Sequence, residues 1–219
     1  MMMADQKSPA MLRPGRPSKA VQDGMSDKII AMAASLFASR GFAGTSMEQV
    51  AQSCGAGKDT IYRRFPSKIV LFEAVVAHAH RRAVARLEKM PVTDGTPLEK
   101  LRLLLRELLI VNMEPDLISL KRITFSETIV FERDQPIPPQ PDPIMERLVA
   151  AVRDAQAAGD LVAADPVELA THLIHCLVAL PTTAAMTGSA AFDDPARIEA
   201  HFQQSWNLLL NGVAPRTRA

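Results

Sequence analysis

Helix start signals recur along the whole sequence and limit its fold more than any other feature. Thr45 and Thr96 each precede a glutamate by three residues, in "TSME" and "TPLE", which is the spacing of a capping box. Three further segments open with aspartate and proline, a pair that favours a helix start: Asp142-Pro143, Asp165-Pro166 and Asp194-Pro195. Hydrophobic residues then recur every three to four positions, without a strand-like alternation between these segments. The sequence therefore predicts an all-α protein with about nine helices.

The composition agrees with a helical core. Hydrophobic residues make up 47% of the 219 residues but aromatic residues only 5%. The core must therefore consist mainly of Ala, Leu, Val, Ile and Met, a set that favours helices. The two cysteines, Cys54 and Cys176, are expected to be buried free thiols in a reducing cytosol. The N-terminus has no apolar run, so no signal peptide is expected.

Residues 169–192 contain no Asp, Glu, Lys or Arg, which raises the question of a membrane span. The segment also holds two His, several Thr and Ser, one Pro and one Gly, and no second segment resembles it. We therefore expect a buried core or interface helix, in a cytoplasmic protein that makes no membrane contact.

Charge is distributed unevenly along the chain. Residues 1–82 contain 12 Lys and Arg against 6 Asp and Glu, a net charge of +6, whereas residues 83–219 contain 13 against 18, a net charge of −5. This asymmetry is typical of a nucleic-acid-binding head on a separate body. Residues 1–24 are basic and lack periodicity, so we expect a disordered arm, a small head at 25–70 and a larger helical body at 71–219.

The segment "GAGKDT" at 55–60 resembles a phosphate-binding loop at first sight, but its spacing excludes one. That loop requires a glycine where this chain has Gln52, and a serine or threonine where it has Asp59. It also follows a β-strand, whereas the preceding "TSMEQVAQSC" has a helical pattern. A nucleotide-hydrolysing enzyme of this class is therefore not expected.

A helix-turn-helix at 46–65 fits the same segment. Gly55 provides the turn between two short helices, because glycine adopts a positive φ at low cost. Ile61 and Phe65 lie four residues apart and point inward, which leaves a polar, basic and aromatic outer face on the second helix. This pattern alone fits both a DNA-reading helix and a helix-turn-helix that serves only packing.

Residues 41–72, "GFAGTSMEQVAQSCGAGKDTIYRRFPSKIVLF", resemble the DNA-binding signature of the tetracycline-repressor (TetR/AcrR) family. The matching residues keep the order and spacing of that signature: Gly41-Phe42, Thr45-Ser46, Val50-Ala51, Gly55, Thr60-Ile61-Tyr62, Phe65, Ser67-Lys68 and Leu71-Phe72. Gly57 departs from it, because many relatives have a capping Ser or Thr there and glycine caps only weakly. The resemblance implies a three-helix DNA-binding head and a body that binds an effector and forms dimers.

The resemblance also implies roles for individual residues. The residues expected to face base edges and the nearby backbone lie on the second short helix: Lys58, Asp59, Thr60 and Arg63. Arg64 of the same helix is also expected to contact DNA. Tyr62 and Lys68 are expected to contact phosphates. Thr45 either combines a helix cap with a phosphate contact or acts only as a cap.

In the N-terminal arm, "RPGRP" at 13–17 is similar to the Gly-Arg-Pro core of an AT-hook. Arg16 would then enter a narrow A·T minor groove. A full hook has an arginine before the glycine, where this chain has Pro14, so a plain basic tail fits equally well.

By the same resemblance, the chain is expected to be a homodimeric repressor that binds a palindromic operator in double-stranded DNA and releases it when a small molecule binds. Dimerisation is expected through helices near 166–188 and 195–211, with a leucine stripe at the interface: Leu169, Leu173, Leu177 and Leu180. The effector is expected to be apolar or amphipathic, and no cofactor is expected. Its pocket is expected to be lined by Leu105, Met113, Phe125 and His175.

Two other functions are compatible with parts of the sequence. His172, His175 and Cys176 share one helix face, where they could bind a metal or act as a nucleophile and a base. No carboxylate shares that face, so packing explains these residues better, and neither an enzyme nor a metal site is expected. A helical scaffold without DNA binding would leave the charge asymmetry and the signature unexplained.

Overall fold

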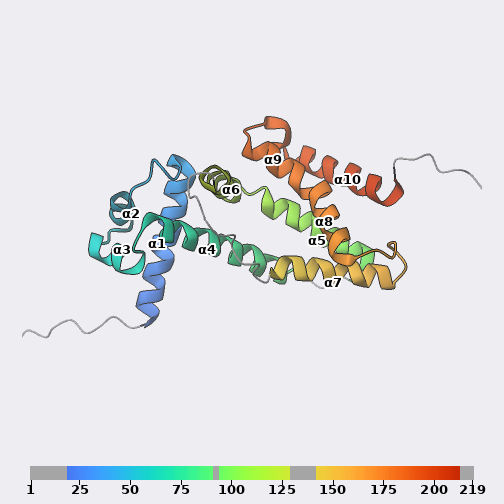
Figure 1. The fold of residues 1–219 in the computed structure, drawn as a ribbon, viewed down its shortest axis with the longest axis horizontal. Coiled ribbons are helices and arrows are strands. Elements are labelled where there is room, and N and C mark those ends of the chain that lie inside the picture. The colour runs from blue at the N-terminus through green and yellow to red at the C-terminus, as the bar shows by residue number, and fades with distance from the viewer. Residues whose placement is uncertain (1–18, 91–93, 129–141, 213–219) are drawn as a thin grey trace, which may run out of the picture.

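The computed structural model describes residues 19–90, 94–128 and 142–212. Within these ranges all regular secondary structure is helical and no strand occurs (Figure 1). The helices are α1 (Lys19–Arg40), α2 (Met47–Cys54), α3 (Lys58–Arg64), α4 (Lys68–Glu88), α5 (Pro97–Asn112), α6 (Pro115–Thr128), α7 (Pro143–Ala157), α8 (Pro166–Ile174), α9 (Leu180–Met186) and α10 (Pro195–Asn211). A π-helical turn, η1 (His175–Ala179), joins α8 and α9 into one continuous helix, and a 3₁₀ turn, η2 (Ala190–Phe192), follows. The described part thus has nine separate α-helices, and the all-α prediction is confirmed.

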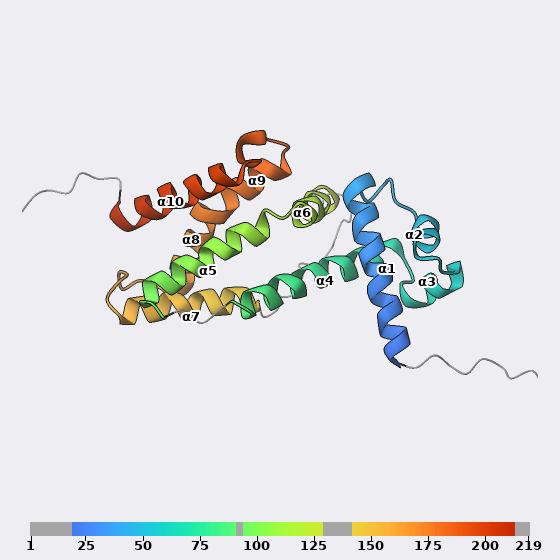
Figure 2. The ribbon, with the colours of Figure 1, turned by 180° about the vertical axis from the view of Figure 1, so that it is seen from behind.

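The helices form an elongated molecule. α1, α2 and α3 lie at one end and α7 to α10 towards the other, as Figure 1 and the view from behind in Figure 2 both show. α4 runs from the three-helix end into the rest of the molecule, and α6 packs beside α1. We call residues 19–75 the head, and α5 together with α7 to α10 the body.

Three phenylalanines form the centre of the head. The rings of Phe37, Phe42 and Phe72 lie within 5.6 Å of one another, measured between centroids, and two of the three contacts are edge-to-face. Leu120 and Ile123 of α6 belong to the same buried cluster. The core of the head is therefore completed by a helix that lies far away in the sequence.

A second buried cluster fills the body, where α5 packs between α7 and the α8–η1 segment. Leu173 and Leu177 of the predicted interface stripe are buried in this cluster, so the prediction that they lie at the dimer interface is wrong. Leu173 lies in α8, which packs against α7, and Leu177 lies in η1, which packs against α5. This side of the helix therefore completes the core of its own protomer. Leu180, in contrast, is 58% exposed.

The first helix begins earlier than predicted. It starts at Lys19 rather than at Ser26, so residues 19–24 are helical and not part of a disordered arm. Gly24 does not stop the helix, because one internal glycine costs only about 1 kcal/mol and the buried residues from Ile29 onward hold the helix in place. The arm at 1–18, with Arg16, lies outside the described residues.

The capping box of α2 lies one residue later than predicted. The Ser46 hydroxyl accepts from the Gln49 N–H at 3.2 Å, and the Gln49 side chain accepts from the Ser46 N–H at 2.9 Å. Thr45 is buried instead, and its hydroxyl donates to the carbonyl oxygens of Gly41 (2.8 Å) and Leu36 (3.2 Å). The predicted box of Thr45 and Glu48 does not form, because Thr45 ties the loop to the end of α1.

The two cysteines differ in their surroundings. Cys54 is buried in the head, and this burial raises the pKa of its thiol. Cys176 is exposed, so the prediction of a second buried thiol is wrong. It lies in the Pro166–Met186 helix, which is long and apolar enough to cross a membrane by length and composition alone. Ala170 and Leu177 of that helix nevertheless pack in the body core, as expected for a core or interface helix.

Candidate nucleic-acid interface

α2 and α3 form a compact helix-turn-helix. Gly55 has a φ of 64°, and its N–H caps α2 by donating to the carbonyl oxygens of Ala51 and Gln52. The next helix starts after Gly57, which occupies the N-cap position without a side-chain hydrogen bond. Ile61 is fully buried under α3, and Phe65 is buried at its end. These anchors fix which side of the seven-residue helix faces solvent.

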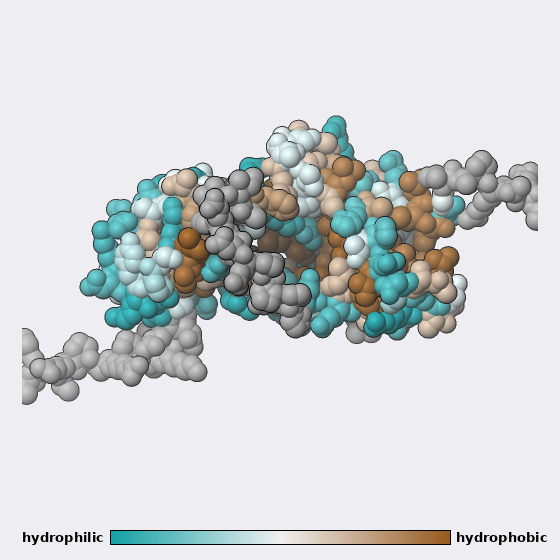
Figure 3. Space-filling view, in the orientation of Figure 1, coloured by the Kyte–Doolittle hydropathy of each residue, from teal (hydrophilic) through white to brown (hydrophobic). Residues whose placement is uncertain are grey.

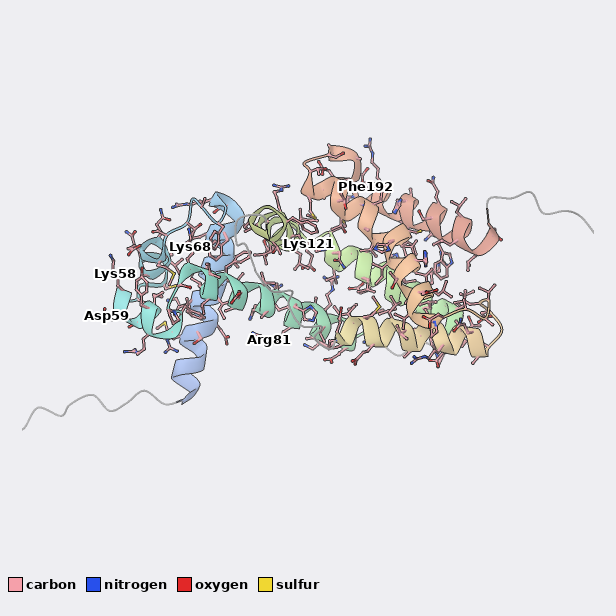
Figure 4. All side chains as sticks on the ribbon, in the orientation of Figure 1. Lys58, Asp59, Lys68, Arg81, Lys121 and Phe192 are labelled. Carbon is pink, nitrogen blue, oxygen red and sulfur yellow. The ribbon has the colours of Figure 1, made fainter. Side chains whose placement is uncertain are left out.

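The solvent-facing side of α3 carries polar, charged and aromatic side chains. Lys58, Asp59 and Arg63 are exposed, Tyr62 is 41% exposed, and Thr60 is half-buried. Figure 4 shows Lys58 and Asp59 at the extreme end of the molecule that α3 forms. The surface in Figure 3 is predominantly hydrophilic at this end. A short helix with hydrogen-bonding groups on a protruding face has the shape that major-groove reading requires.

Glu48 of α2 contacts two of these side chains. Its Oε1 lies 3.1 Å from Lys58 Nζ, and the Tyr62 hydroxyl lies 3.5 Å from the same oxygen. The pKa of Glu48 lies below its ordinary value. The main cause is a hydrogen bond that its carboxylate accepts from its own backbone N–H, followed by the hydrogen bond and the positive charge of Lys58. Glu48 therefore offers Lys58 an intramolecular ion-pair partner. Sequence reasoning missed this contact, because no local pattern joins residues ten positions apart on two helices.

Arg64 and Lys68 point into the protein. Arg64 Nη1 donates to Ser26 Oγ of α1 at 2.9 Å. Lys68 Nζ donates to the carbonyl oxygens of Phe42 (2.8 Å) and Thr45 (3.0 Å), and it lies 4.4 Å from the centroid of the Phe42 ring. Together with the buried Thr45, these residues hold the helix-turn-helix against α1 and α4. In this geometry their side-chain contacts are internal. DNA contacts were expected for Arg64 and Lys68, and for Thr45 a phosphate contact was one of two alternatives.

The predicted effector residues do not converge on one site. Leu105 is fully buried in the body core, and Met113 is half-buried at the end of α5. Phe125 is 68% exposed, and His175 is exposed on η1. None of the four lines the cavity of about 200 Å³ that opens between α4, α5, α6 and α7. The hydrophobic character of Leu105, Met113 and Phe125 indicated burial, but it did not indicate which space each side chain faces.

Sequence reasoning missed the polar side chains of this cavity, among them Lys121 of α6. Its Nζ donates to the side-chain oxygen of Asn112, and both residues line the cavity. Burial lowers the pKa of Lys121 to about 8. In the sequence, only the position of Lys121 within the hydrophobic segment 117–125 could have indicated a role in the cavity. Arg122 lies in the same segment, so this pattern does not distinguish the two residues.

The alternative site at His172, His175 and Cys176 is exposed on the surface of the body. His172 Nδ1 lies 2.8 Å from the Glu168 carbonyl oxygen, within its own helix. Among the described residues, no group of three His, Cys, Asp or Glu side chains could hold a metal ion. The described geometry therefore gives no support to a metal centre in this helix.

Residues 29–75 match the family model described as "Bacterial regulatory proteins, tetR family". This range runs from the middle of α1 into α4 and includes the whole helix-turn-helix. Among curated proteins, none matches the chain. The sequence match therefore concerns the head.

Solved structures match over most of the chain. A TetR-family transcriptional regulator from Mesorhizobium loti is 24% identical with a TM-score of 0.70, and the match covers 86% of this chain and 96% of that chain. A TetR-family regulator from Pseudomonas syringae pv. tomato is 26% identical with a TM-score of 0.65, and the match covers 85% of this chain and 95% of that chain. A TetR-family regulator from Pectobacterium atrosepticum is 23% identical with a TM-score of 0.62, and the match covers 91% of this chain and 100% of that chain. Head and body together therefore share their fold with these regulators.

Proposed function

Because this chain belongs to the TetR family of bacterial transcriptional regulators, we propose that it is a repressor whose homodimer binds a palindromic operator and releases it when a small molecule binds. At the coarser level, the chain is a DNA-binding transcriptional regulator and not an enzyme. Its proposed place of action is the cytoplasm, where its target DNA lies.

The exposed face of α3 is the observation that carries the DNA-binding proposal. Lys58, Asp59, Thr60 and Arg63 are the proposed contacts to base edges and the adjacent backbone, and Tyr62 is the proposed phosphate contact. Arg64, Lys68 and Thr45 are assigned instead to holding the helix in position. Arg16 remains a proposed minor-groove contact of the arm.

The homodimer is proposed to form through residues 166–188 and 195–211. Hydrophobic side chains in these two segments are exposed in the single chain: Val167, Leu180, Leu208, Leu209 and Leu210. Figure 3 shows hydrophobic atoms at the surface around α8 and α10, in contrast to the hydrophilic α3 end. Pairing these faces would remove hydrophobic area from water and place two heads about a twofold axis.

Response to a small molecule is proposed to pass through α4 and α6. Both helices line the cavity between α4 and α7, and both also contribute to the head core, through Val75 of α4 and through Leu120 and Ile123 of α6. A ligand that displaces either helix must therefore displace part of the head. This shared packing couples occupancy of the cavity to the position of α3.

A gel shift with a palindromic fragment from the protein's own promoter region tests DNA binding. Arg63→Ala is expected to weaken binding roughly 5- to 150-fold, the effect of losing a base contact of about 1–3 kcal/mol. Arg153→Ala, at an exposed position of α7, is the matched control and should leave binding unchanged. Absence of binding by the wild-type chain at low salt would refute the proposal.

Light scattering tests the dimer. The wild-type protein is expected to show twice the 23.9 kDa mass of one chain. Leu180→Glu combined with Leu208→Glu should shift it to the monomer, because the charges would lie in the proposed interface. Val162→Glu, at another exposed hydrophobic residue outside both segments, should leave the mass unchanged. A wild-type monomer at high protein concentration would contradict the dimer.

A further inference from the structure

The cavity between α4 and α7 is mainly hydrophobic. Nine of its lining residues are Val, Leu, Ile or Ala, and they come from all four surrounding helices. Figure 3 shows a recess with hydrophobic walls in the middle of the molecule, between the head and the body. Such walls favour a hydrophobic ligand, and the few polar groups among them determine which ligand is selected.

Lys121 supplies a positive charge to this space. Figure 4 places Lys121 on α6, on the side that faces α5. Its ammonium group donates to the Asn112 side-chain oxygen, and Asn112 Nδ2 in turn donates to the Leu108 carbonyl oxygen at 2.7 Å. The amide of Asn112 is thereby held with its oxygen towards Lys121. The ammonium is thus fixed at the cavity wall by a neutral partner.

No carboxylate among the described residues forms an ion pair with Lys121. Burial also lowers its pKa to about 8, which shows that the charged form is poorly compensated. Arg86 of α4, in contrast, forms ion pairs with both Glu107 and Glu114. The Lys121 ammonium thus lies at a hydrophobic cavity without a carboxylate partner among the described residues, and an anionic ligand could supply one.

We propose that this cavity binds a small hydrophobic carboxylate, whose charged group pairs with the Lys121 ammonium and whose hydrocarbon part contacts the surrounding side chains. The inference rests on the proposed function, because it takes this cavity as the effector site. A single ammonium matches a monoanion better than a phosphate dianion, which would need several donors. An apolar cavity of about 150 Å³ holds benzene, so a volume of about 200 Å³ suits an acid of roughly six to eight carbons.

The position of Lys121 also connects the ligand to the head. Leu120 precedes Lys121 in α6 and belongs to the buried core of the head, as does Ile123. Leu120 also lines the cavity, so the two surfaces share a side chain. A carboxylate that attracts Lys121 acts on the helix segment that completes the head core. The ligand's charge, and not only its bulk, is then what the head responds to.

Matched pairs of acids and alcohols test the proposal on the full-length wild-type protein at pH 7. The probes are benzoate, hexanoate and octanoate, with benzyl alcohol, 1-hexanol and 1-octanol as neutral counterparts, measured by calorimetry or ligand-observed NMR. At least one acid should bind about tenfold more tightly than its alcohol, because only the acid forms a charge-assisted contact. If no acid binds better than its alcohol, the proposal is refuted.

The variant Lys121→Met tests whether the preference for acids over alcohols depends on Lys121. This variant should lose the preference for the acid, whereas Lys100→Met, at an exposed lysine of α5, should keep it. A preference that survives in Lys121→Met would overturn the proposal. Should that variant not fold, the NMR signals of the Lys121 side chain in the wild-type protein decide instead, since they must shift when the acid is added. Signals that stay unchanged at saturation would refute the contact.

A separate gel shift without any acid distinguishes this inference from the proposed function. A protein that binds no DNA refutes the regulator proposal, whatever the acid measurements show. A protein that binds DNA but shows no preference for acids refutes only the carboxylate proposal.

Discussion

Serine at position 57 is expected to stabilise α3, the proposed DNA-reading helix, and to strengthen DNA binding slightly. α3 has only seven residues, and its N-cap Gly57 provides no side-chain hydrogen bond. The backbone there has φ −69° and ψ 150°, the extended region that Ser46 also occupies as the cap of α2. A Cβ atom added at Gly57 meets no other atom within 4 Å. A serine side chain therefore fits without strain and can accept from the first N–H groups of α3.

The size of the effect follows from helix-capping energies. Serine exceeds glycine at an N-cap by only a few tenths of a kcal/mol, whereas it exceeds alanine by about 1 kcal/mol. Gly57→Ser and Gly57→Ala, with the same added Cβ, should therefore differ by about 2–4 °C in Tm for a chain of this size. If α3 orders on binding, a gain of about 0.3 kcal/mol should tighten operator binding less than twofold in Gly57→Ser.

Thermal unfolding of the wild type, Gly57→Ser and Gly57→Ala checks the effect on stability, and gel shifts of the same proteins check the effect on DNA affinity. Equal Tm values for the serine and alanine variants would show that the start of α3 does not limit stability. A clear loss of affinity in Gly57→Ser, at unchanged or higher stability, would refute the capping argument. It would indicate instead that Gly57 lets the backbone approach a phosphate closely.

Three further substitutions test contacts described above. Glu48→Gln removes the anion beside Lys58 and should raise DNA affinity up to a few-fold, mostly at low salt; unchanged gel-shift affinity would contradict competition by Glu48. Arg64→Ala should lower stability by about 1–3 kcal/mol in urea unfolding, through the lost bond to Ser26, with a smaller effect on DNA affinity than Arg63→Ala. Lys121→Met should raise the free energy of unfolding at pH 7 by about 1 kcal/mol, because it removes a charge whose burial is unfavourable. This figure is smaller than the full pKa difference implies, because the lysine side chain is partly exposed to solvent. That advantage should shrink as pH rises from about 8 to 10.5, because the wild-type lysine then loses its proton in the folded state before the unfolded one; a constant difference would refute the assignment.

The sequence predicted those features that depend on neighbouring residues. The caps at Thr96, Asp142 and Asp165 lie where expected, because a capping hydrogen bond spans only three residues. The left-handed turn at Gly55 follows equally from local backbone preference. The inward positions of Ile61 and Phe65 follow from helical spacing, which requires no knowledge of the partner helix.

The features that the sequence did not predict depend on contacts between distant segments. Thr45 and Ser46 both carry a hydroxyl, and only the carbonyl oxygens at the end of α1 decide that Ser46 is the cap. Lys121 and Arg122 are adjacent cations about 100° apart on α6. Arg122 donates to carbonyl oxygens of α9, at Met186 and Ala185, whereas Lys121 faces the cavity. No local pattern distinguishes these neighbours, because the difference lies in what packs against each side.

The uninterrupted α4 determines how far a small movement is transmitted. Its 21 residues span about 31 Å, at 1.5 Å per residue. A tilt of about 5° at the cavity end would therefore displace the other end by about 3 Å, close to the 3.4 Å rise of one base pair. In the proposed dimer both heads would move, so a few degrees of rotation would suffice to put two recognition helices out of register with half-sites one helical turn apart.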